Sequence, residues 1–272
     1  MIPHFLVVLE EGADSLPSYA ISLAQALGAK PTVIFPRRDV ANDGSLEARL
    51  ELARGDQGER KGRAREHLDA FKAAAAAAGV EAEVLLPGEW QDPQRDMAPA
   101  FARAFDFSVV GQLEAGKQPG MNELAGHLLA ESGRPVLVVP AIQRAGASFD
   151  RVVVGWDGSA PAARAFGDAL PLLSRAKSVE IVSVTGANAS HAIAQGGERL
   201  AARLRVDGRK AVFRRLPSEE DAANALLSYV ADVSADLLVA GGYGHSRLRE
   251  ALFGGVTRTF LASQTLPLFL SR

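Results

Sequence analysis

Cysteine is absent from the 272-residue chain. Its absence excludes disulfide bonds and thiolate chemistry, and it suits the reducing cytoplasm, where we expect the protein to work. No apolar run approaches the roughly 18 to 20 residues that span a bilayer, so we expect no membrane partner. The N-terminal apolar run, residues 5–9, is stopped by Glu10 and Glu11. It predicts a strand and not a signal peptide.

The chain also lacks an excess of charge of either sign, since 30 Lys and Arg face 32 Asp and Glu, for a net charge of -2 at pH 7. Such a balance gives no overall field for nucleic acid, and no nucleic-acid partner is expected. The five histidines have no metal-ligand spacing, and no G-x-S-x-G nucleophile elbow is present. These absences point away from an enzyme, and slow ATP hydrolysis is the most that we expect.

What the sequence does contain is one alternating pattern, present twice. Each half begins with an apolar run that leads into an acid and a small residue, FLVVLEEG (5–12) and VVVGWDGS (152–159). Each half ends in a run that begins with proline, PVLVVP (135–140) and PLFLS (267–271). A small and polar stretch, residues 141–150, separates them. The length suits two domains, and we place them at residues 1–143 and 149–272.

Within each half, short apolar runs alternate with amphipathic helical patterns. Continuous apolar runs are typical of strands buried on both faces of a parallel sheet, and the alternation predicts an open, doubly wound α/β fold. We expect five strands in each half. Those of the second half are predicted at residues 151–156, 179–184, 210–215, 236–241 and 267–271.

The stretch GGYGHSRLREALFGGVT (241–257) follows the fourth predicted strand of the second half. Ligands of open α/β sheets bind at the carboxyl ends of strands, where glycine lets the backbone approach them. A helix that starts near Gly254 to Thr257 would direct free N–H groups at an anion. Thr257 either caps that helix or donates its hydroxyl to a phosphate oxygen.

General nucleotide motifs fit this chain poorly. GYGHSR has Arg247 where the dinucleotide fingerprint requires its third glycine. GQLEAGKQ (111–118) has the glycines and lysine of a P-loop but ends in Gln118, which has no hydroxyl for magnesium. Neither motif therefore explains the glycines.

The spacing of Gly241, Gly244 and Gly254 resembles the G-2x-G-9x-G-[ST] nucleotide signature of the universal stress protein family. VVVGWDGS resembles the first strand of that family, and the likeness extends over the second half and more weakly over the first. The resemblance implies two tandem Rossmann-like domains of the adenine nucleotide alpha hydrolase type. Each would be a five-stranded parallel sheet flanked by helices, and the two would pack as an internal pseudo-dimer, with further homodimerisation left open.

The resemblance also implies an adenine-nucleotide site, for ATP or ADP with magnesium, and a regulatory or protective role under stress. Asp157 would approach the adenosine, and Val184 would line the adenine pocket. Gly241 and Gly244 would let the loop close on ribose and phosphate, with His245 nearby. The residues that would hold the phosphates are Gly254, Gly255, Val256 and Thr257.

One departure from the family pattern leaves the function open. Gly255 stands where ATP-binding members have Ser or Thr, and a hydroxyl comes only at Thr257. The glycines alternatively serve loop geometry alone, and Asp157 to Ser159 form a turn with Ser159 as the N-cap of the next helix. Three functions remain: a nucleotide-responsive stress protein, a tandem stress-protein scaffold without nucleotide, and a weak ATPase.

The first half lacks the glycine pattern. Gly111 aligns with Gly241, but Glu114 takes the place of Gly244, and a carboxylate there would repel phosphate. We therefore expect this half not to bind nucleotide in the family's way. Trp90, after the third strand of this half, either serves as a packing anchor or belongs to a ligand pocket that faces the cleft of the first half.

Overall fold

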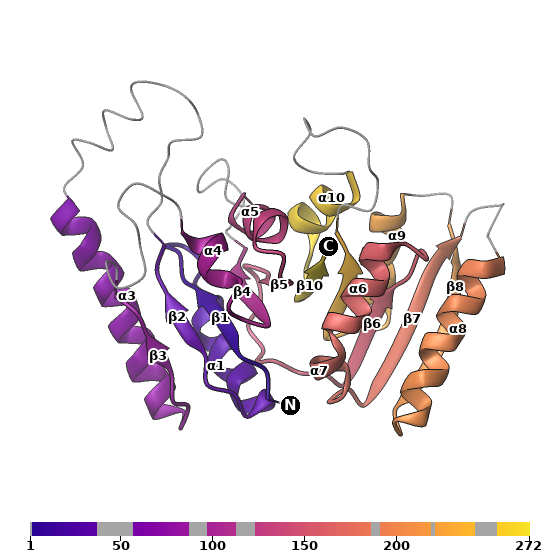
Figure 1. Cartoon of the computed structure of the whole chain (residues 1–272), viewed down its shortest axis with the longest axis horizontal. Coiled ribbons are helices and arrows are strands. Elements are labelled where there is room, and N and C mark those ends of the chain that lie inside the picture. The colour runs from indigo at the N-terminus through magenta and orange to yellow at the C-terminus, as the bar shows by residue number, and fades with distance from the viewer. Residues whose placement is uncertain are drawn as a thin grey trace.

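The computed structural model describes residues 2–36, 57–86, 97–112, 123–185, 191–218, 221–242 and 255–272. Within them, ten strands form one sheet with helices on both faces (Figure 1). The strands of the N-terminal half are β1 (Phe5–Val8), β2 (Thr32–Ile34), β3 (Glu83–Val84), β4 (Phe107–Gly111) and β5 (Val136–Val139). Those of the C-terminal half are β6 (Arg151–Gly155), β7 (Ser178–Thr185), β8 (Lys210–Pro217), β9 (Leu237–Gly241) and β10 (Leu268–Ser271). The prediction of five strands in each half is confirmed.

The sheet consists of two copies of one strand order. The order is β3-β2-β1-β4-β5-β10-β9-β6-β7-β8, and neighbours within each half are parallel. The halves meet through β5 and β10, which are antiparallel and lie side by side in Figure 1. Leu137 and Phe269, the second residues of these strands, pair with each other. An approximate two-fold axis therefore passes through this pair, as expected for an internal pseudo-dimer of Rossmann-like repeats.

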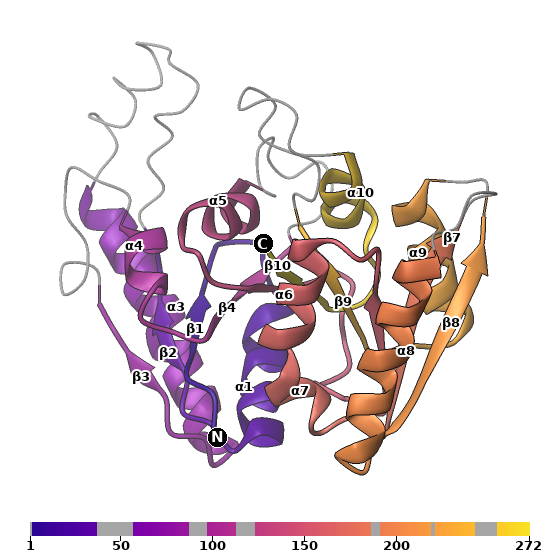
Figure 2. The same ribbon diagram turned by 45° about the vertical axis from the view of Figure 1, so that its right-hand side comes forward.

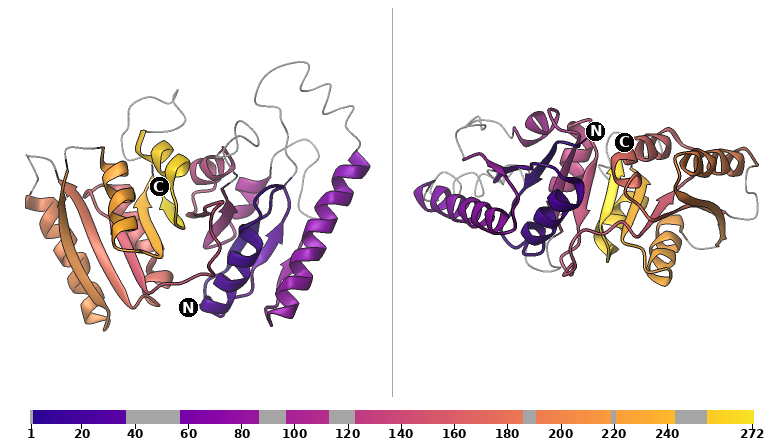
Figure 3. Two further views of the ribbon diagram at one scale, coloured as in Figure 1. Left: turned by 180° about the vertical axis from the view of Figure 1, so that it is seen from behind. Right: turned by 90° about the horizontal axis from the view of Figure 1, so that it is seen from below.

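Helices cover both faces of the sheet in each half. Those of the N-terminal half are α1 (Leu16–Leu27), α3 (Gln57–Ala77), α4 (Ala98–Ala102) and α5 (Glu123–Glu131). Those of the C-terminal half are α6 (Ala160–Asp168), α7 (Leu170–Leu173), α8 (His191–Val206), α9 (Ala222–Asp232) and α10 (Gly255–Ser263). One buried apolar cluster lies under α1, α3, α6, α7 and α8, and another lies under α4, α5, α9 and α10. Helices α3 and α8 stand at the two outer ends of the molecule (Figure 3).

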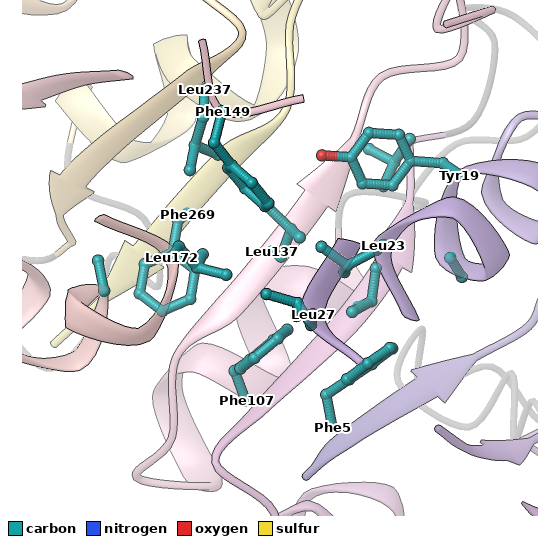
Figure 4. Close-up of a cluster of buried hydrophobic side chains, with 14 of the residues drawn as sticks. Phe5, Tyr19, Leu23, Leu27, Phe107, Leu137, Phe149, Leu172, Leu237 and Phe269 are labelled. Atoms are coloured by element: carbon teal, nitrogen blue, oxygen red, sulfur yellow. The ribbon is translucent and has the colours of Figure 1, made fainter. Parts of the chain in front are cut away.

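Both apolar clusters continue from one half into the other. On the α1 face, Phe5 stacks on Phe107 with ring centroids 5.3 Å apart, and Phe107 meets Phe269 edge-on at 5.8 Å (Figure 4). Phe149, in the connection between the halves, is also buried in this cluster. Because the halves share a sheet and a core, the division into residues 1–143 and 149–272 stays a prediction.

Among the described residues, none of the helices is both long enough and apolar enough to span a membrane.

Candidate nucleotide site

The strand order of the C-terminal half changes direction between β6 and β9. From β6 the chain continues to β7 and β8 on one side, and it later adds β9 and β10 on the other. Ligands of open α/β sheets bind outside the carboxyl ends of strands at such a switch point. Asp157 follows β6 and Gly241 ends β9. Two of the predicted site residues therefore lie on either side of this point.

Strand register brings a third predicted residue to the same edge. Asp157 and Val184 each lie two residues beyond the last β6–β7 pair, which joins Gly155 to Val182. Both residues therefore lie near the carboxyl ends of neighbouring strands, Asp157 just past β6 and Val184 within β7. Gly241 is the last residue of β9, the neighbour of β6 on its other side. Three strand ends thus present a carboxylate, an apolar side chain and a glycine at one edge of the sheet.

The loop after β6 is a tight turn that leads into α6. Gly158 has a left-handed φ of 78°, and the carboxylate of Asp157 accepts the backbone N–H of Ser159 at 2.9 Å. The hydroxyl of Ser159 accepts the N–H of Ala162 at 3.3 Å and caps the helix. The predicted turn and N-cap are confirmed. Asp157 is also exposed, so its carboxylate remains accessible to a ligand at the switch point.

Gly241 is required by packing. A Cβ at this position would lie 2.6 Å from the backbone nitrogen of Ala162 and 2.7 Å from the carbonyl carbon of Pro161, at the start of α6. The same approach recurs in the N-terminal half, where a Cβ on Gly111 would lie 2.5 Å from the Cβ of Ala13, just before α1. In both halves, glycine lets the fourth strand pass close to the helix that follows the first strand. Gly241 therefore has a structural role whether or not a ligand binds.

Helix α10 begins at Gly255, within the predicted range. Thr257 consequently lies inside the first turn, and its prediction as the N-cap is wrong because the cap precedes the first helical residue. The residue is only 2% exposed. Val256 is partly buried and packs against the apolar cluster under α10. The first turn of this helix nevertheless directs backbone N–H groups beyond its N-terminus.

Several predicted residues lie outside the described part of the chain. They are Trp90, Glu114, Gly244, His245, Arg247 and Gly254.

Sequence reasoning did not single out Trp156, which adjoins Asp157. Its indole N–H donates to the carbonyl oxygen of Ile193 at 2.8 Å, and its ring packs over Gly196, where an added Cβ would lie 3.0 Å from the ring. The ring is partly buried against α8. The glycine pair in AQGGERL was the available signal, because two glycines inside a helix suggest a close approach by neighbouring groups.

Comparison with known proteins agrees with this architecture. The model of the universal stress protein family matches residues 148–272. A universal stress protein from Archaeoglobus fulgidus DSM 4304 resembles the chain in fold, with a TM-score of 0.72 at 18% identity over 99% of this chain and 96% of its own. A second structure, from Pseudomonas aeruginosa UCBPP-PA14 and assigned to this family, resembles the chain with a TM-score of 0.60 at 13% identity. The match covers 99% of this chain and 93% of that one.

A search of curated protein sequences finds no match. The two structural relatives establish the fold of the whole chain. The family model matches its C-terminal half. Residues 148–272 thus match the universal stress protein family, and the N-terminal half repeats the fold of this C-terminal half.

Proposed function

We propose that the C-terminal half binds an adenine nucleotide, ATP or ADP, and that the bound nucleotide biases a regulatory or protective role under stress. The observation that carries this proposal is the meeting of Asp157, Val184 and Gly241 on three adjacent strand ends at the switch point. The family resemblance assigns these positions to the adenosine and the loop. Independently of the family, this edge is where an open α/β sheet presents its ligand site.

The described residues suit the parts of a nucleotide to different degrees. The exposed carboxylate of Asp157 can accept hydrogen bonds from ribose hydroxyls, and the partly buried Val184 offers an apolar surface to a base. The N-terminus of α10 can receive phosphate oxygens. The buried side chain of Thr257 is poorly placed to do so. No cluster of metal-binding side chains occurs in the part of the chain that the structure describes, so magnesium would arrive with the phosphates.

Titration calorimetry with ATP and magnesium tests the proposal, after acid extraction of the purified protein to detect bound nucleotide. We expect about one equivalent per chain, because the N-terminal half carries Glu114 in place of a glycine. Asp157→Ala should weaken binding about tenfold, as expected for a lost charge-assisted hydrogen bond. Asp207→Ala, a matched loss of charge just beyond the far end of α8, should not. No binding at millimolar ATP would contradict the proposal.

Trp156 provides a second, optical measurement. It is one of two tryptophans, so Trp90→Phe leaves a single reporter beside Asp157. Nucleotide binding at the switch point should change the fluorescence of this partly buried indole, and Asp157→Ala should remove the change. A heat signal in calorimetry without a fluorescence change would place the nucleotide elsewhere on the chain.

A scaffold without nucleotide is the second candidate. It is favoured by the contacts of Gly241 and Gly111, since packing alone explains a glycine at each fourth strand. Under this alternative, the protein would act through its surface, and extraction would release no nucleotide. For either function we propose the cytoplasm as the location, and homodimerisation of the whole chain remains open.

A further inference from the structure

A cavity of about 480 Å³ lies between α8 and β8, on the outermost strand of the C-terminal half. Figure 2 shows this helix beside that strand at the outer end of the sheet. The polar lining of the cavity consists of His191, Gln195, Glu198, Arg199 and Arg215. None of the predicted nucleotide-site residues lines it. Strand β7 and the packing of Trp156 on α8 separate it from the switch point.

The cavity has an apolar wall formed by Phe213. The ring of this residue lies so close to Gly197 that an added Cβ would be 2.3 Å from two of its carbon atoms. Glycine inside a helix costs about 1 kcal/mol relative to alanine. Here its small size lets the aromatic ring settle between the sheet and α8 while remaining partly exposed. A flat apolar group in the cavity could therefore pack against Phe213 and the nearby Ala194.

The rim of the cavity is cationic. Arg199 and Arg215 are exposed, and neither has a hydrogen-bonding or ion-pair partner within the described residues. The neighbouring Arg214 contrasts with them, because it is bound to the carboxylate of Glu180. The lining contains two guanidinium groups and one carboxylate, that of Glu198, so it has a surplus of positive charge. Guanidinium groups are well suited to bind carboxylate or phosphate through paired hydrogen bonds.

The first two turns of α8 add further donors. The amide nitrogen of Gln195 lies 3.0 Å from Nε2 of His191 and can donate to it, which orders both side chains at the mouth of the cavity. Both residues belong to the N-terminal part of a 16-residue helix, whose dipole favours negative charge there. The apolar wall and the cationic rim together define a ligand with two parts.

We propose that this cavity binds a small aromatic anion, a ring bearing one carboxylate or phosphate group. The ring packs against Phe213, and the anionic group pairs with Arg199 and Arg215. This site does not depend on nucleotide binding at the switch point. It gives the C-terminal half a second ligand surface at its outer edge.

Phenyl phosphate and benzoate are suitable probes, with benzyl alcohol and inorganic phosphate as controls that lack either the charge or the ring. Binding is measured by saturation-transfer NMR and titration on the full chain at millimolar concentrations. We expect phenyl phosphate or benzoate to bind more tightly than both controls. Whichever of these two anions binds more tightly identifies the anionic group that the site prefers. Equal or absent binding of all four compounds would overturn the proposal.

Surface variants test the assignment of the rim. Arg215→Gln should weaken the bound anion about tenfold, and the Arg199→Gln, Arg215→Gln double variant should abolish its advantage over benzyl alcohol. Lys210→Gln removes the same charge from the exposed start of β8, outside the cavity, and should change affinity less than about twofold. Asp157→Ala should leave this binding intact, which separates the two sites. Unchanged affinity in the double variant would refute the proposed rim.

Discussion

At the scale of single residues, Gly241 and Gly167 allow the packing argument to be tested within one half of the chain. A methyl group on Gly241 would meet the backbone of Pro161 and Ala162, whereas one on Gly167, inside α6, would meet nothing within 4 Å. We expect Gly241→Ala to lower the free energy of unfolding by about 1 to 3 kcal/mol through overpacking. Gly167→Ala should raise it by up to about 1 kcal/mol, because alanine favours the helix. Urea unfolding measures both.

The two glycine variants also separate stability from ligand binding. If Gly241→Ala remains as stable as the parent chain, the close approach of β9 to α6 is not rigid, and the glycine would then be explained by a ligand. If it is destabilised while ATP affinity persists at a temperature where it stays folded, packing is the main role of this residue.

Tyr19 offers a second test at this scale. It is 2% exposed, and its hydroxyl has no hydrogen-bond partner within the described residues. Figure 4 shows it beside the cluster that joins the halves. Burial raises the pKa of this hydroxyl well above its usual range. Because an unpaired buried hydroxyl is unfavourable, Tyr19→Phe should leave the free energy of unfolding unchanged or raise it by about 1 kcal/mol. A marked fall in the free energy of unfolding would mean that the hydroxyl of Tyr19 is hydrogen-bonded after all.

At the scale of elements, one charged cluster joins β7, β8 and α9. Glu180 is the third residue of β7 and is 8% exposed. It accepts hydrogen bonds from Tyr229 on α9, at 2.6 Å, and from Arg214 on β8. Burial alone would raise the pKa of Glu180, but these hydrogen bonds and the charges of Arg214 and Arg151 lower it overall. Burial and the bond to Glu180 raise the pKa of Tyr229 to about 12.

These shifts predict how stability depends on pH. Since the folded pKa of Glu180 is lowered, its contribution is complete above the ordinary Glu pKa and is lost as the pH falls through the lowered value. Glu180→Gln should therefore cost about 1 to 2 kcal/mol at neutral pH and progressively less in acid. Glu81→Gln, which removes a carboxylate that is 80% exposed, should cost little at any pH. A cost of Glu180→Gln that does not vary with pH would contradict this account.

The raised pKa of Tyr229 makes stability depend on pH in the opposite direction. Its contribution is complete below the ordinary Tyr pKa and is lost as the pH rises through about 12.

The same elements show what the sequence could and could not predict. The apolar runs predicted the strands because a strand buried on both faces needs consecutive apolar residues. Glu180 interrupts such a run, and its partners come from another strand and a helix, so no local pattern reveals its pairing. The start of α10 followed from Gly254 to Thr257, whereas the need for glycine at position 241 arises from α6, far away in the chain. Sequence reasoning thus found the edge of the sheet that holds the candidate site, but it did not distinguish packing from binding there.

At the scale of the whole molecule, the two halves contact each other in equivalent ways on both sides of the β5–β10 pair. Gln112, which follows β4, donates its side-chain amide to the carbonyl oxygen of Leu261 on α10 at 2.9 Å. Gly242, which follows β9, packs so closely against Leu129 on α5 that an added Cβ would lie 2.9 Å from it. The first residue after each fourth strand therefore touches the last helix of the other half. The N-terminal half therefore contacts Gly242, the residue directly after the Gly241 end of β9.

This symmetry predicts the behaviour of residues 148–272 when they are produced alone. Without β5, the strand β10 would expose the edge that Leu137 and its neighbours cover, and the apolar ring of Phe269 would lose its partner Phe107. A free apolar strand edge favours pairing with another chain. Because Leu137 and Phe269 are equivalent positions, β10 of a second copy can take the place of β5, with the two Phe269 residues facing each other.

We therefore expect the isolated half to form a homodimer, whose mass in light scattering is twice that of its chain and falls on dilution. The full chain, in which β5 already covers this edge, provides the baseline under the same conditions. Phe269→Leu, which reduces the apolar surface at the centre of the pairing, should weaken the dimer. If the isolated half is folded but monomeric at every concentration, the antiparallel pair does not drive the association of the halves. The cores on either side of it, with the contacts of Gln112 and Leu129, would then hold the two repeats together.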